Sequence, residues 1–319
     1  MKTDNELILL IDGLNLFTRH FVANPSVSEA GEHIGGVIGF LNGISGLCEK
    51  FKPTSAIIVW EGGGSTRKRQ IFSEYKQKRK PAKLNRYYEN DIPNTVENRN
   101  DQIKILIEII NNLPISQLYI SDCEADDVIG YLCKYTYRDK RKLIFSSDKD
   151  FYQLLDKKTI IYSPTWKKIV TSKEVKEKFE ISPENFCLAK SICGDSSDNI
   201  NGVRGAGFKV LSKRFPELSH KDSVTIDDIL DRCSEELSDG KKIKLYKNIL
   251  DSDSLIRRNW KLICLDTNSL SISQVSKVNF ELEKEASQRN KINSMRILTR
   301  VGVQSFNIDR LFLSLKCIR

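Results

Sequence analysis

Hydrophobic residues form short continuous runs along the first half of the chain. Four of these runs lack helical spacing and are predicted as buried strands, at residues 7–11, 57–60, 118–120 and 143–145. Between them, apolar residues recur at helical spacing in three segments, 34–51, 103–110 and 128–135. This alternation predicts an α/β fold with a central, mostly parallel sheet flanked by helices.

Acidic residues follow three of the predicted strands directly. Asp12, Glu61 and Asp148 stand where the apolar runs end. In open parallel sheets, functional sites form beyond the carboxyl ends of the strands. Each acid by itself has an ordinary interpretation as a loop or helix-cap residue. Three of them at three strand ends favour a site.

The run Glu124-Ala125-Asp126-Asp127 holds three carboxylates in four residues. Such close like charges repel by roughly a kcal/mol or more per pair at a protein surface, unless a cation lies among them. Carboxylate oxygens are the hard ligands that Mg2+ and Mn2+ prefer. Together with the strand-end acids and a later acidic cluster, this run predicts a site for two divalent metals.

A basic stretch separates the second predicted strand from the next helix. Nine lysines and arginines lie in 67–86, opposed only by Glu74: Arg67, Lys68, Arg69, Lys76, Lys78, Arg79, Lys80, Lys83 and Arg86. Phe72 and Tyr75 are interleaved with them. Phosphate binding with aromatic platforms for bases is one interpretation, and a solvated loop is the other. The net charge of +9 is compatible with a polyanionic partner without requiring one.

A glycine-rich turn follows a further acidic pair. Asp195 and Asp198 are three residues apart, so on a helical turn they share a face. Gly202, Gly205 and Gly207 allow a tight turn and a close approach of the backbone. A turn that enters a helix offers free N–H groups to a phosphate, although a plain helical hairpin is the simpler alternative.

The rest of the composition restricts location more than chemistry. No apolar run approaches the roughly 20 residues of a membrane span, and the first run is interrupted by Asp12, so we expect neither a membrane association nor a signal peptide. The eight cysteines form no Cys-x-x-Cys pair, so the sequence argues against a zinc site. We expect a cytoplasmic protein, in the host cytoplasm if the gene is viral. Beyond about residue 217, helices at 243–260, 292–298 and 308–315 carry no evident chemistry.

The motifs together resemble the 5′ nuclease family, which includes flap endonucleases, phage 5′–3′ exonucleases and the 5′ nuclease domain of bacterial DNA polymerase I, with phage-type members nearest. The matching motifs are Ile11-Asp12-Gly13, Tyr75-Lys76 with Arg79, Glu124-Ala125-Asp126-Asp127, Ser147-Asp148-Lys149-Asp150 with Gln153-Leu154, and Gly194-Asp195 through Gly207. Two residues depart from the family pattern: Glu61 replaces an aspartate, and Ser147 replaces a glycine.

The resemblance implies an organisation and an activity. Residues 1–180 would form the catalytic core with a basic helical arch at about 65–95, residues 181–270 a helix–three-turn–helix DNA-binding subdomain, and residues 271–319 a helical extension of unknown role. The expected reaction is hydrolysis of phosphodiesters in branched or 5′-ended DNA, or in RNA–DNA hybrids, during primer removal or flap processing. We expect a monomer, with replication proteins as further partners. The alternatives are a non-catalytic binder of branched DNA and a PIN-like ribonuclease.

The resemblance also implies roles for individual residues. Two Mg2+ ions, replaceable by Mn2+, would be held by nine carboxylates: Asp12, Glu61, Glu124, Asp126, Asp127, Asp148, Asp150, Asp195 and Asp198. Asp127 and Asp198 would lie farther from the metals than the others. Lys76 and Arg79 would be catalytic. The nucleic-acid contacts would be Arg67, Lys68, Arg69, Tyr75, Lys78, Lys80, Lys83, Gly202, Gly205, Gly207 and Lys209, with packing of the arch as the alternative for Tyr75. A K+ ion is expected at the glycine turn.

Overall fold

A single six-stranded sheet forms the centre of the computed structural model, which describes residues 6–78, 95–220, 222–284 and 289–318. The strand order is β3-β2-β1-β4-β5-β6, and only β6 runs antiparallel to its neighbour. The strands are β1 (Leu7–Asp12), β2 (Ser55–Trp60), β3 (Ser116–Tyr119), β4 (Arg141–Phe145), β5 (Thr159–Ser163) and β6 (Lys168–Val170). The predicted mostly parallel sheet is confirmed, and the central position of β1 brings its carboxyl end between those of β2 and β4.

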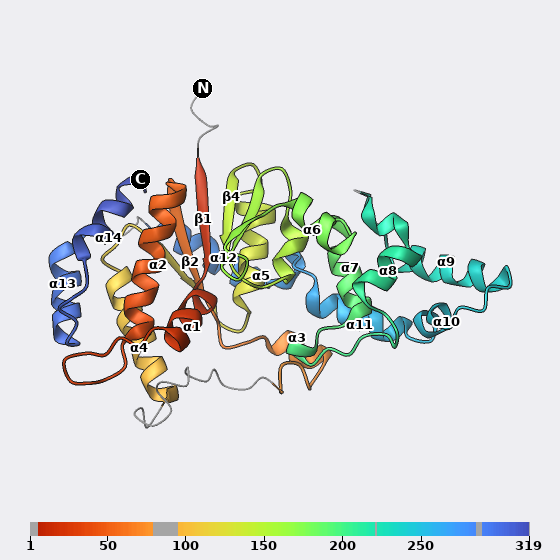
Figure 1. Cartoon of the computed structure of the whole chain (residues 1–319), viewed down its shortest axis with the longest axis horizontal. Helices are drawn as coiled ribbons and strands as arrows, with labels where there is room; N and C mark the ends of the chain where they lie inside the picture. Colours follow the sequence, from red (N-terminus) through yellow and green to blue (C-terminus); the bar gives the residue numbers. More distant parts are fainter. Residues whose placement is uncertain (1–5, 79–94, 221, 285–288, 319) are drawn as a thin grey trace.

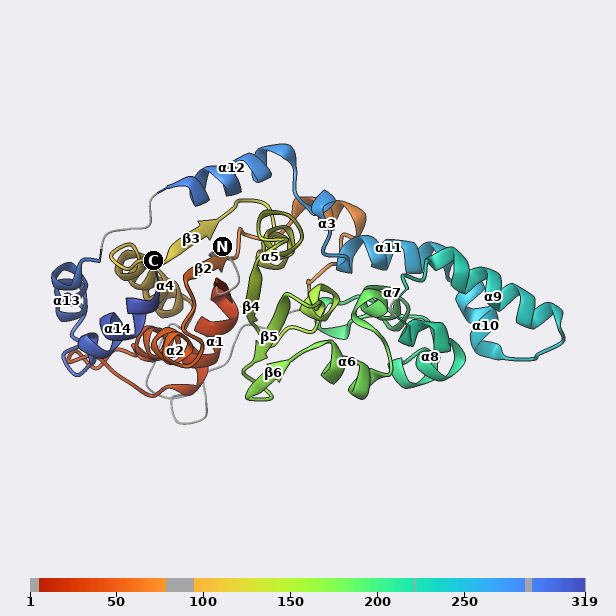
Figure 2. The same cartoon turned by 90° about the horizontal axis from the view of Figure 1, so that it is seen from above.

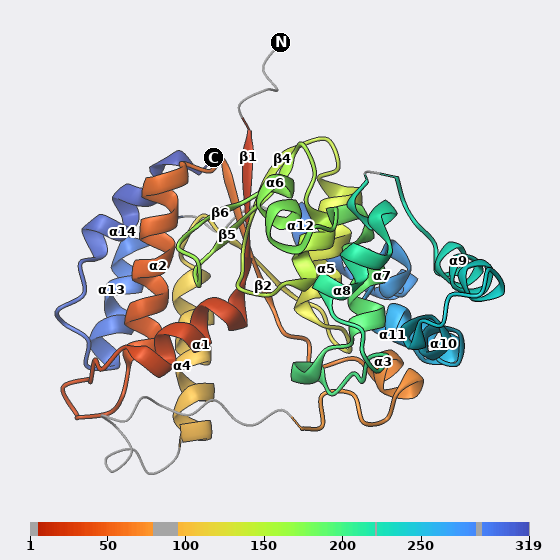
Figure 3. The same cartoon turned by 45° about the vertical axis from the view of Figure 1, so that its right-hand side comes forward.

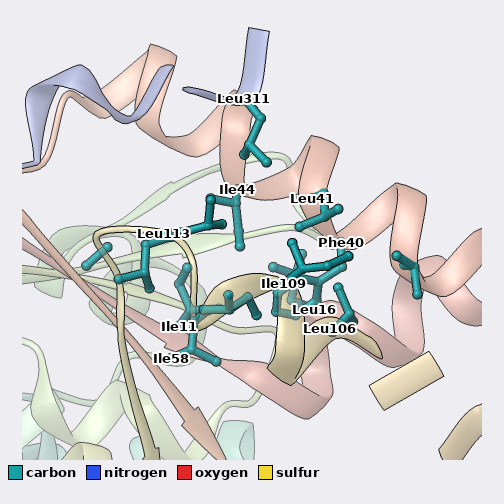
Figure 4. Packing of buried hydrophobic residues seen from close by; sticks show 14 of the residues in the cluster. Ile11, Leu16, Phe40, Leu41, Ile44, Ile58, Leu106, Ile109, Leu113 and Leu311 are labelled. Atoms are coloured by element: carbon teal, nitrogen blue, oxygen red, sulfur yellow. The ribbon is translucent and has the colours of Figure 1, made fainter. Parts of the chain in front are cut away.

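Helices cover both faces of the sheet (Figure 1). Side chains alternate between the faces, so Leu9 and Ile11 of β1 enter one core while Ile8 and Leu10 enter the other. Three helices of the first half of the chain contribute to the first core: α1 (Gly13–Ala23), α2 (Gly35–Phe51) and α4 (Thr95–Ile110). Figure 4 shows this packing around Ile11, with Phe40, Ile44 and Ile109 directed inward. The second core packs against α5 (Ala125–Tyr131), which continues as a π-helical turn, Leu132–Thr136.

A helical subdomain extends from one edge of the sheet (Figure 2). It has its own core, in which Ile192, Val203, Leu211 and Ile249 are buried together. Its helices are α7 (Pro183–Cys193), α8 (Phe208–Arg214), α9 (Ile226–Ser238), α10 (Lys244–Leu250) and α11 (Asp253–Ile263). The helix α6 (Ser172–Phe179) leads into it from β6, and α11 returns along α7 towards the sheet.

The C-terminal helices pack back onto the main body. The first, α12 (Ile272–Glu283), contacts the edge strand β3. The other two, α13 (Lys291–Arg300) and α14 (Ile308–Ser314), lie beside α4 and α2, as Figure 3 shows. Leu298 and Leu311 are buried in the same core as Ile11. The last part of the chain therefore stabilises the sheet that carries the strand-end acids.

Several elements differ from the sequence-based predictions. The segment expected as one helix at 243–260 is two, α10 and α11, separated at Asp251 and Ser252, because short polar side chains favour local turns over a helix interior. Several further elements were not predicted from the apolar pattern, among them α1, α6, α7, α9, α12 and the β5–β6 hairpin. Within the described residues, no helix has the length and apolar character needed to cross a membrane.

Candidate active site

The carboxyl ends of three adjacent strands bring Asp12, Glu61 and Asp148 to one edge of the sheet. Asp12 ends β1 and caps α1, where its Oδ1 accepts a hydrogen bond from the Asn15 N–H at 3.0 Å. Glu61 follows β2 and accepts from the N–H of Ala125 at 3.3 Å, which ties β2 to the start of α5. One cavity of about 660 Å3 is lined by all three acids together with Lys76, Glu124 and Asp126. The predicted convergence of strand-end acids with the acidic run is therefore present in the structure.

The first carboxylate cluster consists of Glu124, Asp126 and Asp127, whose oxygen atoms lie within 4.8 Å of one another. Asp126 and Asp127 occupy the first turn of α5, where the helix dipole favours negative charge. Burial raises the pKa of both carboxyls, even though a nearby Lys68 opposes this effect. Burial also disfavours ionised Glu124, but Lys68 and Lys76 outweigh it and lower the pKa of Glu124 to about 2.

Lys68 lies inside this cluster. Its Nζ is 2.7 Å from Glu124, 3.0 Å from Asp127 and 3.7 Å from Asp126, and its side chain is only 6% exposed. The neighbouring Arg67 and Arg69 are exposed. In place of the predicted nucleic-acid contact, the structure shows Lys68 as an ion-pairing residue, because its ammonium is enclosed by carboxylates.

Tyr75 and Lys76 connect the first cluster to a second one. The Tyr75 hydroxyl donates to Glu124 at 2.8 Å, and its ring is buried beside Cys187 and Leu262. The ring therefore packs inside the protein, as the alternative interpretation expected, and is not displayed for stacking on a base. The Lys76 ammonium pairs with Glu124, while the Lys76 N–H donates to the carbonyl of Asp198 at 3.0 Å. Lys76 adopts a left-handed conformation, with φ of 59°, between these two attachments.

The second carboxylate cluster consists of Asp150, Asp195 and Asp198. Asp150 begins a 3-10 turn, Asp150–Leu154, after β4, and Asp195 caps another, Ser196–Asp198, by accepting from the N–H of Ser197 at 2.8 Å. Asp148 joins the two clusters, since it lines the first cavity and also a neighbouring one of about 470 Å3 with Lys190 and Asp195.

Lys190 is a site residue that the sequence analysis missed. It lies on α7, and its Nζ is 2.6 Å from Asp195 and also pairs with Asp150. Burial opposes ionisation of Asp195, but Lys190 outweighs it and lowers the pKa of that carboxyl. Burial nevertheless raises the pKa of Asp150 to about 7. The helix α7 was not predicted, so no pattern distinguished this lysine from a surface residue.

The nine acids fit a divalent metal centre by their chemistry. Carboxylate oxygens suit Mg2+ and Mn2+. Burial raises the pKa of Asp12 to about 6, so the protein alone does not fully compensate a negative charge there. The Oδ1 atom of Asp127 is buried and has no hydrogen-bond partner among the described residues, a state that is costly for an ionised oxygen. A cation bound nearby would stabilise the negative charge of both groups.

Comparison with known proteins agrees with this geometry. Residues 7–180 match the family model described as 5′-3′ exonuclease, N-terminal resolvase-like domain. The 5′-3′ exonuclease of Buchnera aphidicola is 31% identical over 223 residues, which is 69% of this chain and 73% of that protein. The chain belongs to the 5′–3′ exonuclease family. The resemblance seen in the sequence is confirmed, and the chain is a nuclease of this family; the two alternatives are not favoured.

Two further proteins are similar to this 5′–3′ exonuclease family chain over most of its length. DNA polymerase I of Bacillus subtilis is 29% identical over 318 residues, which is 97% of this chain but 34% of the polymerase, so the chain spans about a third of that relative. The flap endonuclease of bacteriophage T5, solved in complex with DNA and metal ions, aligns with a TM-score of 0.67 at 22% identity, covering 93% of this chain and 99% of that chain. The latter comparison confirms the predicted central, mostly parallel sheet flanked by helices.

The segment of this family member predicted to form a basic arch is described only up to Lys78, and this described part is here called the base of the predicted arch. The helix α3 (Thr66–Ile71) begins at a Ser65 cap, and the chain then turns through Tyr75 to an exposed Lys78. Arg79, Lys80 and Lys83, predicted as catalytic or nucleic-acid-binding residues, lie outside the described residues. The Arg258 guanidinium of α11 stacks on the Phe72 ring at 4.2 Å and so attaches this base to the subdomain.

The three predicted glycines of the turn differ in what constrains them. A Cβ on Gly202 would lie 2.0 Å from the carbonyl oxygen of Cys193, at the end of α7. Gly205 has φ of +86° with open space around it, and Gly207 has open space and an ordinary φ of −148°. Lys209 is exposed in the first turn of α8, beyond Gly207. The turn thus presents an open backbone beside a basic residue.

Proposed function

We propose that this chain is a structure-specific 5′ nuclease that depends on divalent metal ions and hydrolyses phosphodiesters of branched or 5′-ended DNA. The observation that carries the proposal is the joining of two carboxylate clusters, through Asp148 and the Tyr75–Lys76 pair, around adjacent cavities at the edge of a parallel sheet. The T5 flap endonuclease, which shares the fold, was solved with DNA and metal ions.

We propose that two Mg2+ ions, replaceable by Mn2+, are the resident metals. Asp12, Glu61, Glu124 and Asp126 would hold one, and Asp148, Asp150 and Asp195 the other, since these acids line the two cavities or belong to the two clusters. Asp127 and Asp198 would lie farther from the two ions than the other seven carboxylates. When bound, such a pair of ions lowers the pKa of an attacking water and stabilises the leaving oxygen.

The side chains of the protein would orient the substrate. Lys76 lines the cavity with Glu124 and Asp148, so its ammonium lies where a phosphodiester entering the cavity would need a positive partner. We propose the same role for Arg79, as the family resemblance implies. The Tyr75 hydroxyl, kept protonated by burial, would hold Glu124 in position. No side chain needs to act as a general base.

The subdomain and the basic segment would bind the nucleic acid away from the cut. The open backbone at Gly205 and Gly207, with Lys209 beside it, suits a duplex phosphate, and a K+ ion at this turn is part of the proposal. Arg67, Arg69 and Lys78 are exposed and would contact phosphates. Such contacts recognise strand structure more than sequence, and binding should weaken steeply with salt.

The biological assignments extend this proposal. We propose residues 1–180 as the catalytic core, 181–270 as the helix–three-turn–helix subdomain and 271–319 as the extension that packs on the core. RNA–DNA hybrids would be a second substrate, and primer removal or flap processing would be the setting. A cytoplasmic monomer that works with replication proteins completes the proposal.

A 5′-labelled flap substrate tests the central claim. Wild-type protein with Mg2+ should release a short 5′ product, whereas protein with EDTA and the Asp148→Asn variant should not, while both still bind the flap. Lys104→Met, which changes an exposed lysine on α4 that pairs with Asp101, is the control. Tight binding without cleavage in Mg2+ or Mn2+ would contradict the proposal, and Glu61→Asp would then test whether the departure from the family aspartate is responsible.

A further inference from the structure

Lys68 is the one residue of α3 that is fully buried, although Ile71 of the same helix also packs against buried hydrophobic residues. Its neighbours Arg67, Arg69 and Gln70 are exposed, whereas Lys68 is buried. The Ser65 hydroxyl that caps α3 accepts from the Lys68 N–H at 3.2 Å, so the cap fixes this residue at the first turn of the helix. The helix therefore holds one ammonium in a set position against the first carboxylate cluster.

The electrostatic environment of Lys68 is strongly negative. Three carboxylates surround its Nζ at 2.7 to 3.7 Å. Burial alone would lower the pKa of Lys68, but Asp126, Asp127 and Glu124 outweigh it and raise that pKa well above the ordinary value. The three ion pairs therefore favour the charged form of Lys68. Without it, three buried carboxylates would repel one another in an environment of low polarity.

Lys68 and Lys76 share Glu124 as an ion-pair partner, Lys68 at its Oε2 atom and Lys76 at its Oε1 atom. Lys76 lines the cavity and its side chain is 19% exposed. Lys68 does not line that cavity, and its side chain is 6% exposed. Substrate and solvent can thus reach the Lys76 side chain through the cavity, whereas Lys68 contacts the first carboxylate cluster from the protein interior. The two lysines can therefore have different tasks although they stand eight residues apart in one basic stretch.

We propose that Lys68 is a positioning residue, a resident counter-ion that holds Glu124 and Asp127 in place before a divalent cation binds and that sets the affinity of the first cluster for that cation. The inference rests on the proposed metal-dependent function. It concerns a side chain that does not touch the substrate, and it predicts opposite effects on the metal-free fold and on metal binding.

The test compares Mn2+ binding, measured from the electron paramagnetic resonance signal of free Mn2+, with melting temperatures in EDTA. Lys68→Met should melt at a lower temperature than wild type in EDTA, because the carboxylates lose their counter-ion. It should also bind Mn2+ at least about tenfold more tightly, because a positive charge beside the ion is removed. Lys68→Arg, which keeps the charge, should remain close to wild type. Lys104→Met is the exposed control.

A double variant keeps the test decisive if Lys68→Met does not fold. In Lys68→Met with Asp127→Asn, one charge of each sign is removed, so most of the loss in metal-free melting temperature should be recovered. No recovery would overturn the proposal. Unchanged Mn2+ affinity in Lys68→Met would overturn it too, and weaker flap binding with that unchanged affinity would identify Lys68 as a DNA contact.

Failure of the underlying function is separable from failure of this inference. If wild type and Asp126→Asn bind Mn2+ equally weakly, the first cluster is not a metal site and both proposals are overturned. If Asp126→Asn binds one Mn2+ ion fewer than wild type while Lys68→Met behaves as the Lys104→Met control, the metal site stands and only the counter-ion role is refuted. A melting temperature lowered equally with and without Mn2+, at unchanged affinity, would indicate a purely structural lysine.

Discussion

Alanine substitutions at Gly202, Gly205 and Gly207 should have graded effects, although the sequence presents the three glycines as equivalent. In Gly202→Ala, the new Cβ would lie 2.0 Å from the Cys193 oxygen and 2.7 Å from the Gly194 nitrogen. Real Cβ contacts are essentially never below 3.0 Å, so α7 and the turn must separate by about 1 Å. Overpacking of this kind costs about 1–3 kcal/mol, and we expect the upper end because both neighbours are backbone atoms.

The other two substitutions meet no such contact. Gly205→Ala has open space, but its φ of +86° suits only glycine, and a left-handed alanine costs roughly 1–2 kcal/mol. Gly207→Ala has open space and an extended φ of −148°, so the free energy of unfolding should change by less than about 0.5 kcal/mol. The added Cβ of Gly207→Ala would nevertheless lie on the part of the backbone that is proposed to contact a phosphate, so it should hinder that contact.

Urea unfolding and flap binding in EDTA measure the two effects separately. The expected order of destabilisation is Gly202→Ala, then Gly205→Ala, then Gly207→Ala, with weakened flap binding in Gly207→Ala despite its wild-type stability. If Gly207→Ala unfolds as easily as Gly202→Ala, the steric argument is wrong. If it binds flap DNA as wild type does, the proposed phosphate contact at this turn is refuted.

Three further predictions concern the clusters and the arch base. Lys76→Ala should lower single-turnover cleavage about 10²–10³-fold with a smaller effect on flap binding, and unchanged turnover would exclude a catalytic role. Because burial raises the pKa of Asp12 to about 6 and of Asp150 to about 7, the folded state retains protons that the unfolded chain releases. The free energy of unfolding in EDTA should therefore fall as pH rises from about 4 to about 7. Saturating Mg2+ should reverse this trend in thermal melts. A pH-independent melting temperature in EDTA would contradict the prediction. Arg258→Leu should remove a stacking energy of about 0.5–2 kcal/mol, and a double-mutant cycle with Phe72→Ala should show coupling of that size in urea unfolding, whereas additive effects would show that the contact is not formed.

The pattern of apolar residues was sufficient to predict strands whose residues are all buried. The runs at 7–11, 57–60 and 143–145 became β1, β2 and β4, because strands buried on both faces carry apolar residues at every position. The same reasoning placed acids at strand ends, since parallel strands end at one edge of the sheet. The helix α1 and the β5–β6 hairpin were not recognised, although α1 buries Leu16, Phe17 and Phe21. Their burial depends on neighbours that are distant in the chain.

The amino-acid sequence by itself determined the α/β architecture, the acids at the strand ends and the motifs of the 5′–3′ exonuclease family. Only the tertiary structure decided what each basic residue does. Lys68 and Lys76 belong to one basic stretch, yet one is enclosed within the first cluster and the other lines the cavity. Lys190, which no motif marked, enters the second cluster from α7. The sequence determines which residues are charged. The solvent exposure and the ion-pair partners of each charged side chain depend on contacts between segments that are far apart in the chain.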